Sequence, residues 1–132
     1  IMISKGHSKT AFEKEWLKTV VEYANESDFL SDMYGHITSD YSRFEVDHIL
    51  GAKTKRKING VSWRVGELAI MPIPFELHNV MSKHPYNRTT NPGKYRSVFG
   101  HEKLVWLAMI RAMQIDGYEI PFSEEVIQSI IR

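Results

Sequence analysis

The hydrophobic positions repeat with a helical period towards both ends of the chain. Between residues 9 and 24, apolar side chains recur every three or four positions, which predicts a helix with Ser8 as its N-cap. Residues 101–115 and 123–131 show the same period, and Ser123 with the two glutamates after it is typical of a helix start. We therefore predict helices on both sides of a central segment.

The central segment instead alternates between apolar and polar positions, which is the period of a strand. Residues 43–49 alternate well enough for one strand, and residues 55–65 read as a hairpin around the Asn59-Gly60 pair, which suits a type I′ turn. The short apolar run 68–71 predicts a buried strand. A small β region is therefore expected in the middle of the chain.

Shorter helices are predicted around this β region. A helix over about 75–82 has Pro74 in its first turn, where the missing N–H is tolerated. A short helical turn ends at Gly35, and one or two turns over 94–99 end at Gly100. The order of these elements predicts an α+β fold.

The composition is that of a soluble globular protein. The chain has 132 residues, of which 42% are hydrophobic and 25% charged, so we expect one domain over residues 1–132 with a modest core. The chain has no cysteine, which excludes disulfides and thiolate zinc sites. No apolar run approaches the roughly 20 residues of a membrane span, and residues 1–6 lack the apolar stretch of a signal peptide. We therefore expect a cytoplasmic protein with no membrane partner.

Basic residues are concentrated in one segment, although the formal net charge is only +1. Residues 53–96 contain nine Lys or Arg and two acidic residues, whereas residues 1–47 contain five basic and nine acidic ones. Clustered positive charge attracts a polyanion such as nucleic acid, although a solvated lysine-rich loop has the same composition. The candidate nucleic-acid-binding residues are Lys53, Lys55, Arg56, Lys57, Arg64, Lys83, Arg88, Lys94 and Arg96.

Two histidine-containing stretches lie around this basic segment. Asp47 is followed by His48, and about thirty residues later His78 lies on the helix predicted over 75–82. A carboxylate and an imidazole are ligands for a divalent metal, and a neutral imidazole is a base suited to water at neutral pH. Adjacent strand residues point to opposite faces, so Asp47 and His48 share a site only if the strand ends or twists near Gly51. His78 would then close on Asp47 from the helix.

This strand–strand–helix order resembles the ββα-metal nucleases, the HNH family in the broad sense. Five motifs extend the resemblance: Asp47-His48 with Gly51, Ile70 to Ile73, Leu77-His78-Asn79, His84-Pro85 and Lys94 to Gly100. With these motifs the chain is most similar to the phage recombination-enhancement nucleases, the Ref family of RecA-dependent enzymes, over about residues 43–107. Many relatives have two adjacent histidines around His78 and a cysteine where this chain has Pro74.

The resemblance implies both a site and a cofactor. Asp47 and His78 match the family's metal ligands, and His48 matches its general base. His84 matches a later histidine, either a third metal ligand or a phosphate contact. The family implies an embedded ββα-metal (HNH-like) unit at about residues 43–82 of a small helical domain. The cofactor is expected to be a divalent metal, Mg²⁺ first, with Mn²⁺ or Zn²⁺ as alternatives.

The implied function is a metal-dependent DNA endonuclease of bacteriophage recombination in the host cytoplasm. DNA and a RecA-type recombinase filament are the expected partners. Two other functions fit the same residues. A non-catalytic module could hold DNA or a recombinase filament with the basic surface, and a structural metal site could tie the β segments to a helix. Metal-dependent cleavage, EDTA-insensitive binding and metal-dependent stability distinguish the three.

Overall fold

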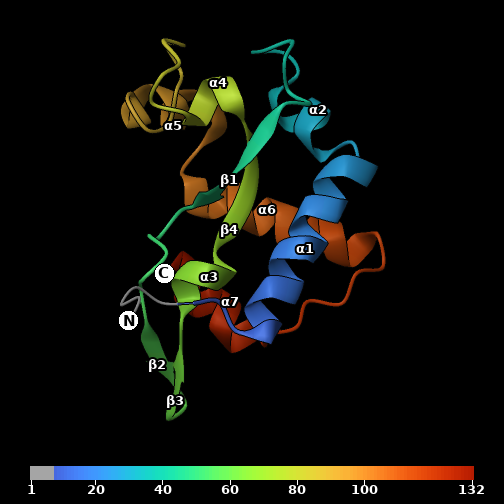
Figure 1. Cartoon of the computed structure of the whole chain (residues 1–132), viewed down its shortest axis with the longest axis vertical. Coiled ribbons are helices and arrows are strands. Elements are labelled where there is room, and N and C mark those ends of the chain that lie inside the picture. Colours follow the sequence, from blue (N-terminus) through green and yellow to red (C-terminus); the bar gives the residue numbers. More distant parts are fainter. Residues whose placement is uncertain (1–7) are drawn as a thin grey trace.

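The computed structural model describes residues 8–132, in which helices lie around one small antiparallel sheet and a second small antiparallel sheet projects from the body of the molecule (Figure 1). In chain order the elements of this part are α1 (Ala11–Glu26), α2 (Phe29–Tyr34), β1 (Phe44–His48), β2 (Arg56–Ile58), β3 (Val61–Trp63), α3 (Val65–Leu68), β4 (Ile70–Pro74), α4 (Phe75–His78), α5 (Pro92–Phe99), α6 (Glu102–Ile115) and α7 (Glu124–Ile131). One sheet pairs β1 with β4, and the other is the β2–β3 hairpin inserted between them. The expected α+β class is confirmed. Among the helices of this part, none has the length and apolarity needed to cross a membrane.

The β1–β4 ladder forms its hydrogen bonds at alternate positions. At its two ends, Ile49 N donates to Ala69 O (3.1 Å) and Phe75 N donates to Arg43 O (2.8 Å). Hydrogen-bonded and non-hydrogen-bonded pairs alternate along an antiparallel ladder. The hydrogen-bonded pairs between these ends are therefore the odd-numbered residues of both strands.

Two prolines fix the register of this ladder. Pro72 and Pro74 lie at even-numbered positions, where a backbone nitrogen points away from β1, so their missing N–H groups remove no ladder bond. A slip of one residue would bring both proline nitrogens into the ladder and reverse the faces of every side chain. In the observed register Glu45 and Asp47 lie on one face of β1, and His48 lies on the other.

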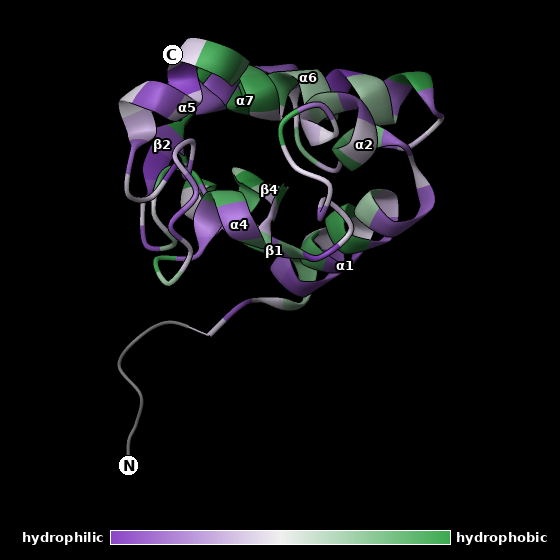
Figure 2. Cartoon of the chain, turned by 90° about the horizontal axis from the view of Figure 1, so that it is seen from above, coloured by the Kyte–Doolittle hydropathy of each residue, from purple (hydrophilic) through white to green (hydrophobic). Residues whose placement is uncertain are grey.

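β4 lies at the centre of the hydrophobic core. Seen from above, α6 and α7 lie on one side of β4, and β1 and α1 lie on the other (Figure 2). All five residues of β4 are buried, and Ile70, Met71 and Ile73 share one apolar cluster with Trp16 of α1 and Trp106 of α6. Full burial of a side chain such as Met71 or Ile73 contributes about 1.5–3 kcal/mol. This packing holds β4 in place, and with it β1 and the one-turn helix α4.

Two helix boundaries differ from the sequence-based prediction. The prediction that α1 starts after Ser8 is wrong, because Thr10 and Glu13 form a capping box and the helix begins at Ala11. α4 ends at His78 rather than near residue 82, because the backbone of Asn79 is extended (φ −72°, ψ 133°). The helical end of the β4–α4 unit is therefore a single turn.

The prediction for the segment between the hairpin and β4 is also wrong. Residues 61–65 and 68–71 were expected as strands, but Val65–Leu68 form the helical turn α3 and β4 begins only at Ile70. All four residues of α3 are buried. A short segment that is buried on every side has no exposed face, so its hydrophobic pattern does not distinguish a strand from a helical turn.

Replacement of the observed N-cap should weaken α1. Thr10 Oγ1 accepts a hydrogen bond from Glu13 N (3.1 Å), so Thr10→Ala should lower the free energy of unfolding by about 1 kcal/mol, measured by urea denaturation. Ser8→Ala is the matched control and should change nothing, because the interaction of Ser8 is through its backbone carbonyl, which accepts from Arg64. Equal losses in the two variants would contradict the cap assignment.

Candidate functional site

His78 lies between two carboxylates that come from one face of β1. Side chains on a strand repeat every two residues, so Glu45 and Asp47 point the same way, and β4 leads directly into α4, which carries His78. His78 Nδ1 is 2.6 Å from Glu45 Oε1, and His78 Nε2 is 3.6 Å from Asp47 Oδ1. The structure therefore brings together two of the predicted metal ligands, Asp47 and His78, and adds Glu45.

The short helix α4 is held by the loop that follows it. The buried Asn87 side chain donates to Glu76 O (3.0 Å) and Asn79 O (2.9 Å), which satisfies carbonyls at the end of the turn. Asn79 Nδ2 also donates to Glu45 Oε2 (3.0 Å). These bonds fix His78 against β1 although α4 has only four residues.

Asp47 is buried and belongs to a chain of ion pairs. Its two carboxylate oxygens accept from Arg88, from Nε at 2.5 Å and from Nη2 at 2.7 Å. Arg88 Nη1 also donates to Glu102 (2.7 Å), and Arg96 donates to the same carboxylate. With 2% of its surface exposed, Asp47 requires such compensation, because an unpaired buried charge is strongly destabilising.

The charges of the cluster stabilise one another. The pKa of His78 is raised, chiefly by Asp47 and further by Glu45, although burial opposes the shift. The hydrogen bond with His78 lowers the pKa of Glu45. Burial acts to raise the pKa of Asp47, but His78 and Arg88 outweigh it and lower that pKa. The site therefore favours positive charge at His78, and a metal ion bound there would replace the imidazole proton.

The geometry of Asp47 and His78 fits a shared divalent ion. Two atoms that each lie about 2.1 Å from one ion are roughly 3–3.6 Å apart, depending on the angle, and Asp47 Oδ1 and His78 Nε2 are separated by 3.6 Å. Glu45 on the other ring nitrogen is the type of outer carboxylate that orients a metal-binding histidine. Asp47 has about four lone-pair sites, so its bonds with Arg88 leave room for an ion.

This candidate ion would have only two protein ligands. Within residues 8–132, no group of three or more His, Asp or Glu side chains is arranged to hold a metal ion. Mg²⁺ is commonly held by one or two carboxylates, with water and phosphate oxygens as its other ligands. A site with few protein ligands is compatible with an ion that also contacts a phosphate substrate.

His48 lies apart from this cluster. Its Nε2 is 2.9 Å from Oε1 of Glu67, which belongs to α3 and is 2% exposed. Figure 1 shows α3 and α4 at opposite ends of β4; His48 meets its partner on α3, whereas His78 comes from α4. No hydrogen bond or ion pair within the described residues joins His48 to Asp47 or His78.

His84, the predicted third ligand or phosphate contact, is engaged in a turn. Its Nδ1 accepts a hydrogen bond from Tyr86 N (3.1 Å), and its ring lies 6.0 Å from the Tyr86 ring. In the described part of the chain, neither contact connects His84 to Asp47 or His78.

The predicted nucleic-acid-binding residues divide into two groups. The arginines bond within the fold: Arg56 to the carbonyl of Ser129, Arg64 to Glu13, Arg88 to Asp47 and Glu102, and Arg96 to Glu102. The lysines are exposed: Lys53, Lys55, Lys57, Lys83 and Lys94. The arginines therefore have a structural role in this state, and the lysines are the side chains available to a polyanion.

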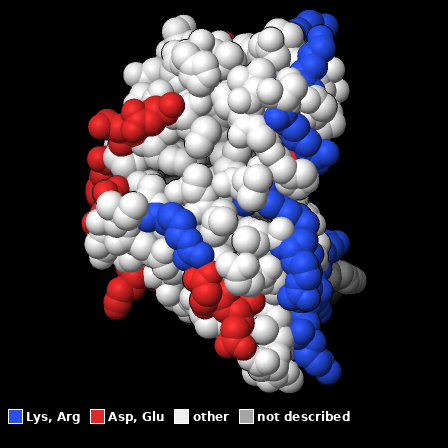
Figure 3. Space-filling view, turned by 180° about the vertical axis from the view of Figure 1, so that it is seen from behind, with Lys and Arg blue, Asp and Glu red and all other residues white. Residues whose placement is uncertain are grey.

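Positive charge follows one edge of the molecule. In the view from behind, Lys and Arg side chains line this edge from end to end, while most acidic side chains lie towards the other edge or the lower centre (Figure 3). A polyanion lying along this edge would meet little opposing charge.

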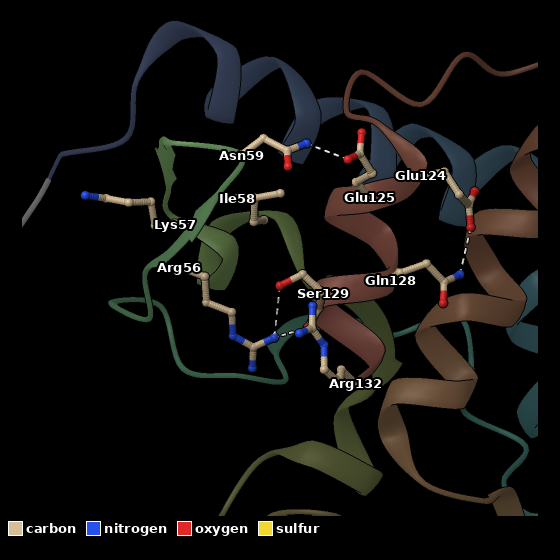
Figure 4. Close-up of a pocket in the computed structure, with 9 residues that line it drawn as sticks. All are labelled: Arg56, Lys57, Ile58, Asn59, Glu124, Glu125, Gln128, Ser129 and Arg132. Carbon is tan, nitrogen blue, oxygen red and sulfur yellow. Dashed lines mark hydrogen bonds between the residues drawn. The ribbon is translucent and has the colours of Figure 1, made fainter.

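An open pocket of about 780 Å³ separates the hairpin from α7. Figure 4 shows Arg56 of β2 reaching Ser129 of α7, and Asn59 of the turn reaching Glu125. The pocket is lined by both basic and acidic side chains, and neither Asp47 nor His78 lines it. The contacts across it attach the hairpin to α7.

Two acidic residues of the site were missed by sequence reasoning. Glu45 is two positions before Asp47, so the strand period already placed it on the same face. Glu67 lies in the segment where strands were expected, and no local signal showed that it would face His48.

Comparison of the chain with models of known protein families, with curated proteins and with solved structures gives no match. The assignment of the site therefore depends on the geometry described above.

The buried Glu102 carboxylate should contribute to stability in a defined pH window. Burial opposes its ionisation, but Arg96 and Arg88 outweigh this and lower the pKa of Glu102 from 4.5 to about 2. A lowered folded-state pKa gives stability that is present above pH 4.5 and lost as the pH falls towards 2. As the pH falls between these limits, the free energy of unfolding of the wild-type protein should decrease by on the order of 2 kcal/mol more than that of Glu102→Gln. Urea unfolding at several pH values measures this difference.

Glu124→Gln is the control for this comparison. Hydrogen bonding to Arg111 also lowers the pKa of Glu124 to about 2, but that pair is exposed to solvent. Removal of the Glu124 carboxylate should therefore change the pH dependence of the free energy of unfolding much less than removal of the Glu102 carboxylate. Equal effects in the two variants would contradict the importance of burial at Glu102.

Proposed function

We propose that this chain is a metal-dependent endonuclease that hydrolyses phosphodiester bonds in DNA. The observation that carries the proposal is the position of His78, with a glutamate on one ring nitrogen and the buried Asp47 facing the other. Metal-binding histidines are commonly arranged with such an outer carboxylate. The resemblance of the Asp47-His48 and Leu77-His78-Asn79 motifs to HNH enzymes supports the same assignment.

In this proposal each residue has a separate task. Asp47 and His78 hold the ion, Glu45 orients His78, and Arg88 keeps Asp47 ionised in its buried position. A bound divalent ion would supply Lewis-acid stabilisation of negative charge on the phosphate and on the leaving oxygen. Mg²⁺ is the first candidate for the ion, with Mn²⁺ and Zn²⁺ as alternatives.

His48 acts as the general base. It takes a proton from a water molecule, whose oxygen then attacks phosphorus, and the 3′ oxygen leaves and takes a proton from a second water molecule. The products carry a 5′-phosphate and a 3′-hydroxyl group. β1 ends at His48, and Gly51 N donates to His48 O (3.0 Å) in the turn that follows.

The exposed lysines supply sequence-independent contacts to the DNA backbone. They follow each of the two candidate histidines in the sequence, with Lys53, Lys55 and Lys57 after His48, and Lys83 and Lys94 after His78. Phosphate contacts of this kind position a duplex or single strand but carry little sequence information. The role in phage recombination and the partnership with a RecA-type filament rest on the sequence motifs alone.

A non-catalytic DNA-binding or filament-binding module is the second candidate function. The observation that favours it is the separation of His48 from the Asp47–His78 pair, because His48 is bonded to Glu67 instead. Such a module would bind DNA equally well with EDTA and would not depend on His78.

Cleavage of supercoiled plasmid with Mg²⁺ or Mn²⁺ tests the endonuclease. His78→Ala and Asp47→Ala should abolish metal-dependent cutting. Both should also weaken Mn²⁺ binding, which electron paramagnetic resonance measures. His48→Ala should lower the rate about 10²- to 10⁴-fold and leave Mn²⁺ binding intact. Glu45→Gln should lower metal affinity or activity about 10- to 100-fold.

The exposed His36 provides the control, because it lies outside the site and contacts only the Phe99 ring among the described interactions. His36→Ala should cut plasmid at the wild-type rate. DNA binding without cutting in any metal would reject the endonuclease and favour the binding module.

The hairpin lysines should determine part of the salt dependence of DNA binding. In Lys55→Ala/Lys57→Ala, the slope of log affinity against log salt should become shallower by about 0.9 for each duplex phosphate that the variant no longer neutralises. Fluorescence anisotropy of a labelled duplex at several salt concentrations measures this slope. Lys14→Ala/Lys18→Ala removes two exposed lysines of α1 and should leave the slope unchanged. Identical slopes in the two double variants would exclude the hairpin from the interface.

A further inference from the structure

The buried carboxylate of Glu67 is the partner of the proposed base. Glu67 Oε1 lies 2.9 Å from His48 Nε2, and the two side chains are 2% and 28% exposed. A carboxylate only accepts hydrogen bonds, so the ring nitrogen that faces it carries the proton. The neutral His48 ring then has its lone pair on Nδ1. No hydrogen bond within the described residues reaches that nitrogen.

We propose that Glu67 is a positioning residue, which fixes His48 as the Nε2–H tautomer so that Nδ1 serves as the base. This inference rests on the proposed endonuclease function. The tautomer of a histidine is determined by the hydrogen bond at its other nitrogen, and a carboxylate partner also stabilises the imidazolium that forms when the base takes a proton. Glu67 acts through His48 and needs no contact with DNA.

The helical turn that carries Glu67 is held close to the segment that follows His48. Gly66 N donates to Thr54 O (3.0 Å), and a Cβ added at Gly66 would lie 2.0 Å from Gly51 O. Only glycine permits this approach of two backbone segments. The loop after His48 and the turn bearing Glu67 therefore meet at a fixed separation.

A second anchor holds the other end of the same turn. The buried indole nitrogen Trp16 Nε1 donates to Leu68 O (2.9 Å), which ties α3 to α1. α3 is thus fixed to α1 on one side and to the 51–54 loop on the other. Such rigid support is what a residue that orients a catalytic group requires.

The tautomer of His48 can be measured without DNA or metal. Long-range ¹H–¹⁵N spectra at alkaline pH, where imidazoles are neutral, distinguish the Nε2–H from the Nδ1–H form. Wild-type His48 should be in the Nε2–H form. Glu67→Gln keeps a hydrogen-bond acceptor of the same size and should retain this form, whereas Glu67→Leu should give a mixture of tautomers.

The cleavage rate provides the second measurement. Glu67→Leu should lower kcat about 10- to 100-fold with little change in KM, and Glu67→Gln should recover part of the loss. Glu13→Gln is the stability control, because Glu13 is also buried but pairs with Arg64. It should lower the melting temperature without changing the His48 signals.

The results separate the inference from the proposed function. An Nδ1–H tautomer in a wild-type protein that cuts DNA would overturn the inference alone, as would a wild-type kcat in Glu67→Leu. A wild-type protein that cuts no DNA under any metal condition would overturn the proposed function, and with it the catalytic role of Glu67.

Discussion

The pairing of β1 with β4 is the constraint on which the rest of the structure depends. Pro72 and Pro74 have no N–H groups, so β4 pairs through its odd-numbered residues. In this register the side chains of Glu45 and Asp47 face His78 of α4, and the side chain of His48 faces Glu67 of α3. Because β4 is buried in the core, neither the register nor the two faces of β1 can change without loss of packing.

Each of the two candidate histidines has its own glutamate, and the two pairs use opposite ring nitrogens. Glu45 is bonded to Nδ1 of His78, so Nε2 faces Asp47. Glu67 is bonded to Nε2 of His48, so Nδ1 is the nitrogen that serves as the proposed base. In the proposed function, one strand therefore presents a metal-binding group on one face and a basic group on the other. The proposed reaction uses both at the end of that strand.

The sequence was informative where local chemistry determines the structure. The Asn59-Gly60 pair predicts the hairpin because both residues adopt positive φ angles, and Ser123 predicts the start of α7 by capping Val126 N. Burial overrides such signals at α3, whose four residues are all buried and have no exposed face. The partners of the site could not be predicted, because Glu67 reaches His48 and Arg88 reaches Asp47 only through tertiary packing. The exposed lysines and the engaged arginines are likewise indistinguishable in the sequence.

The hairpin enters and leaves the fold between two segments that are already joined to each other. Ile49 N bonds to Ala69 O before it, and Gly66 N bonds to Thr54 O at its base. The strand pair is therefore closed at the base of the hairpin, and the hairpin adds its contacts with α7 and the contact of Trp63 with Phe12 of α1. Substitutions in the turn and in the exposed lysines of the hairpin can therefore change the basic surface without disturbing the pairing of β1 with β4.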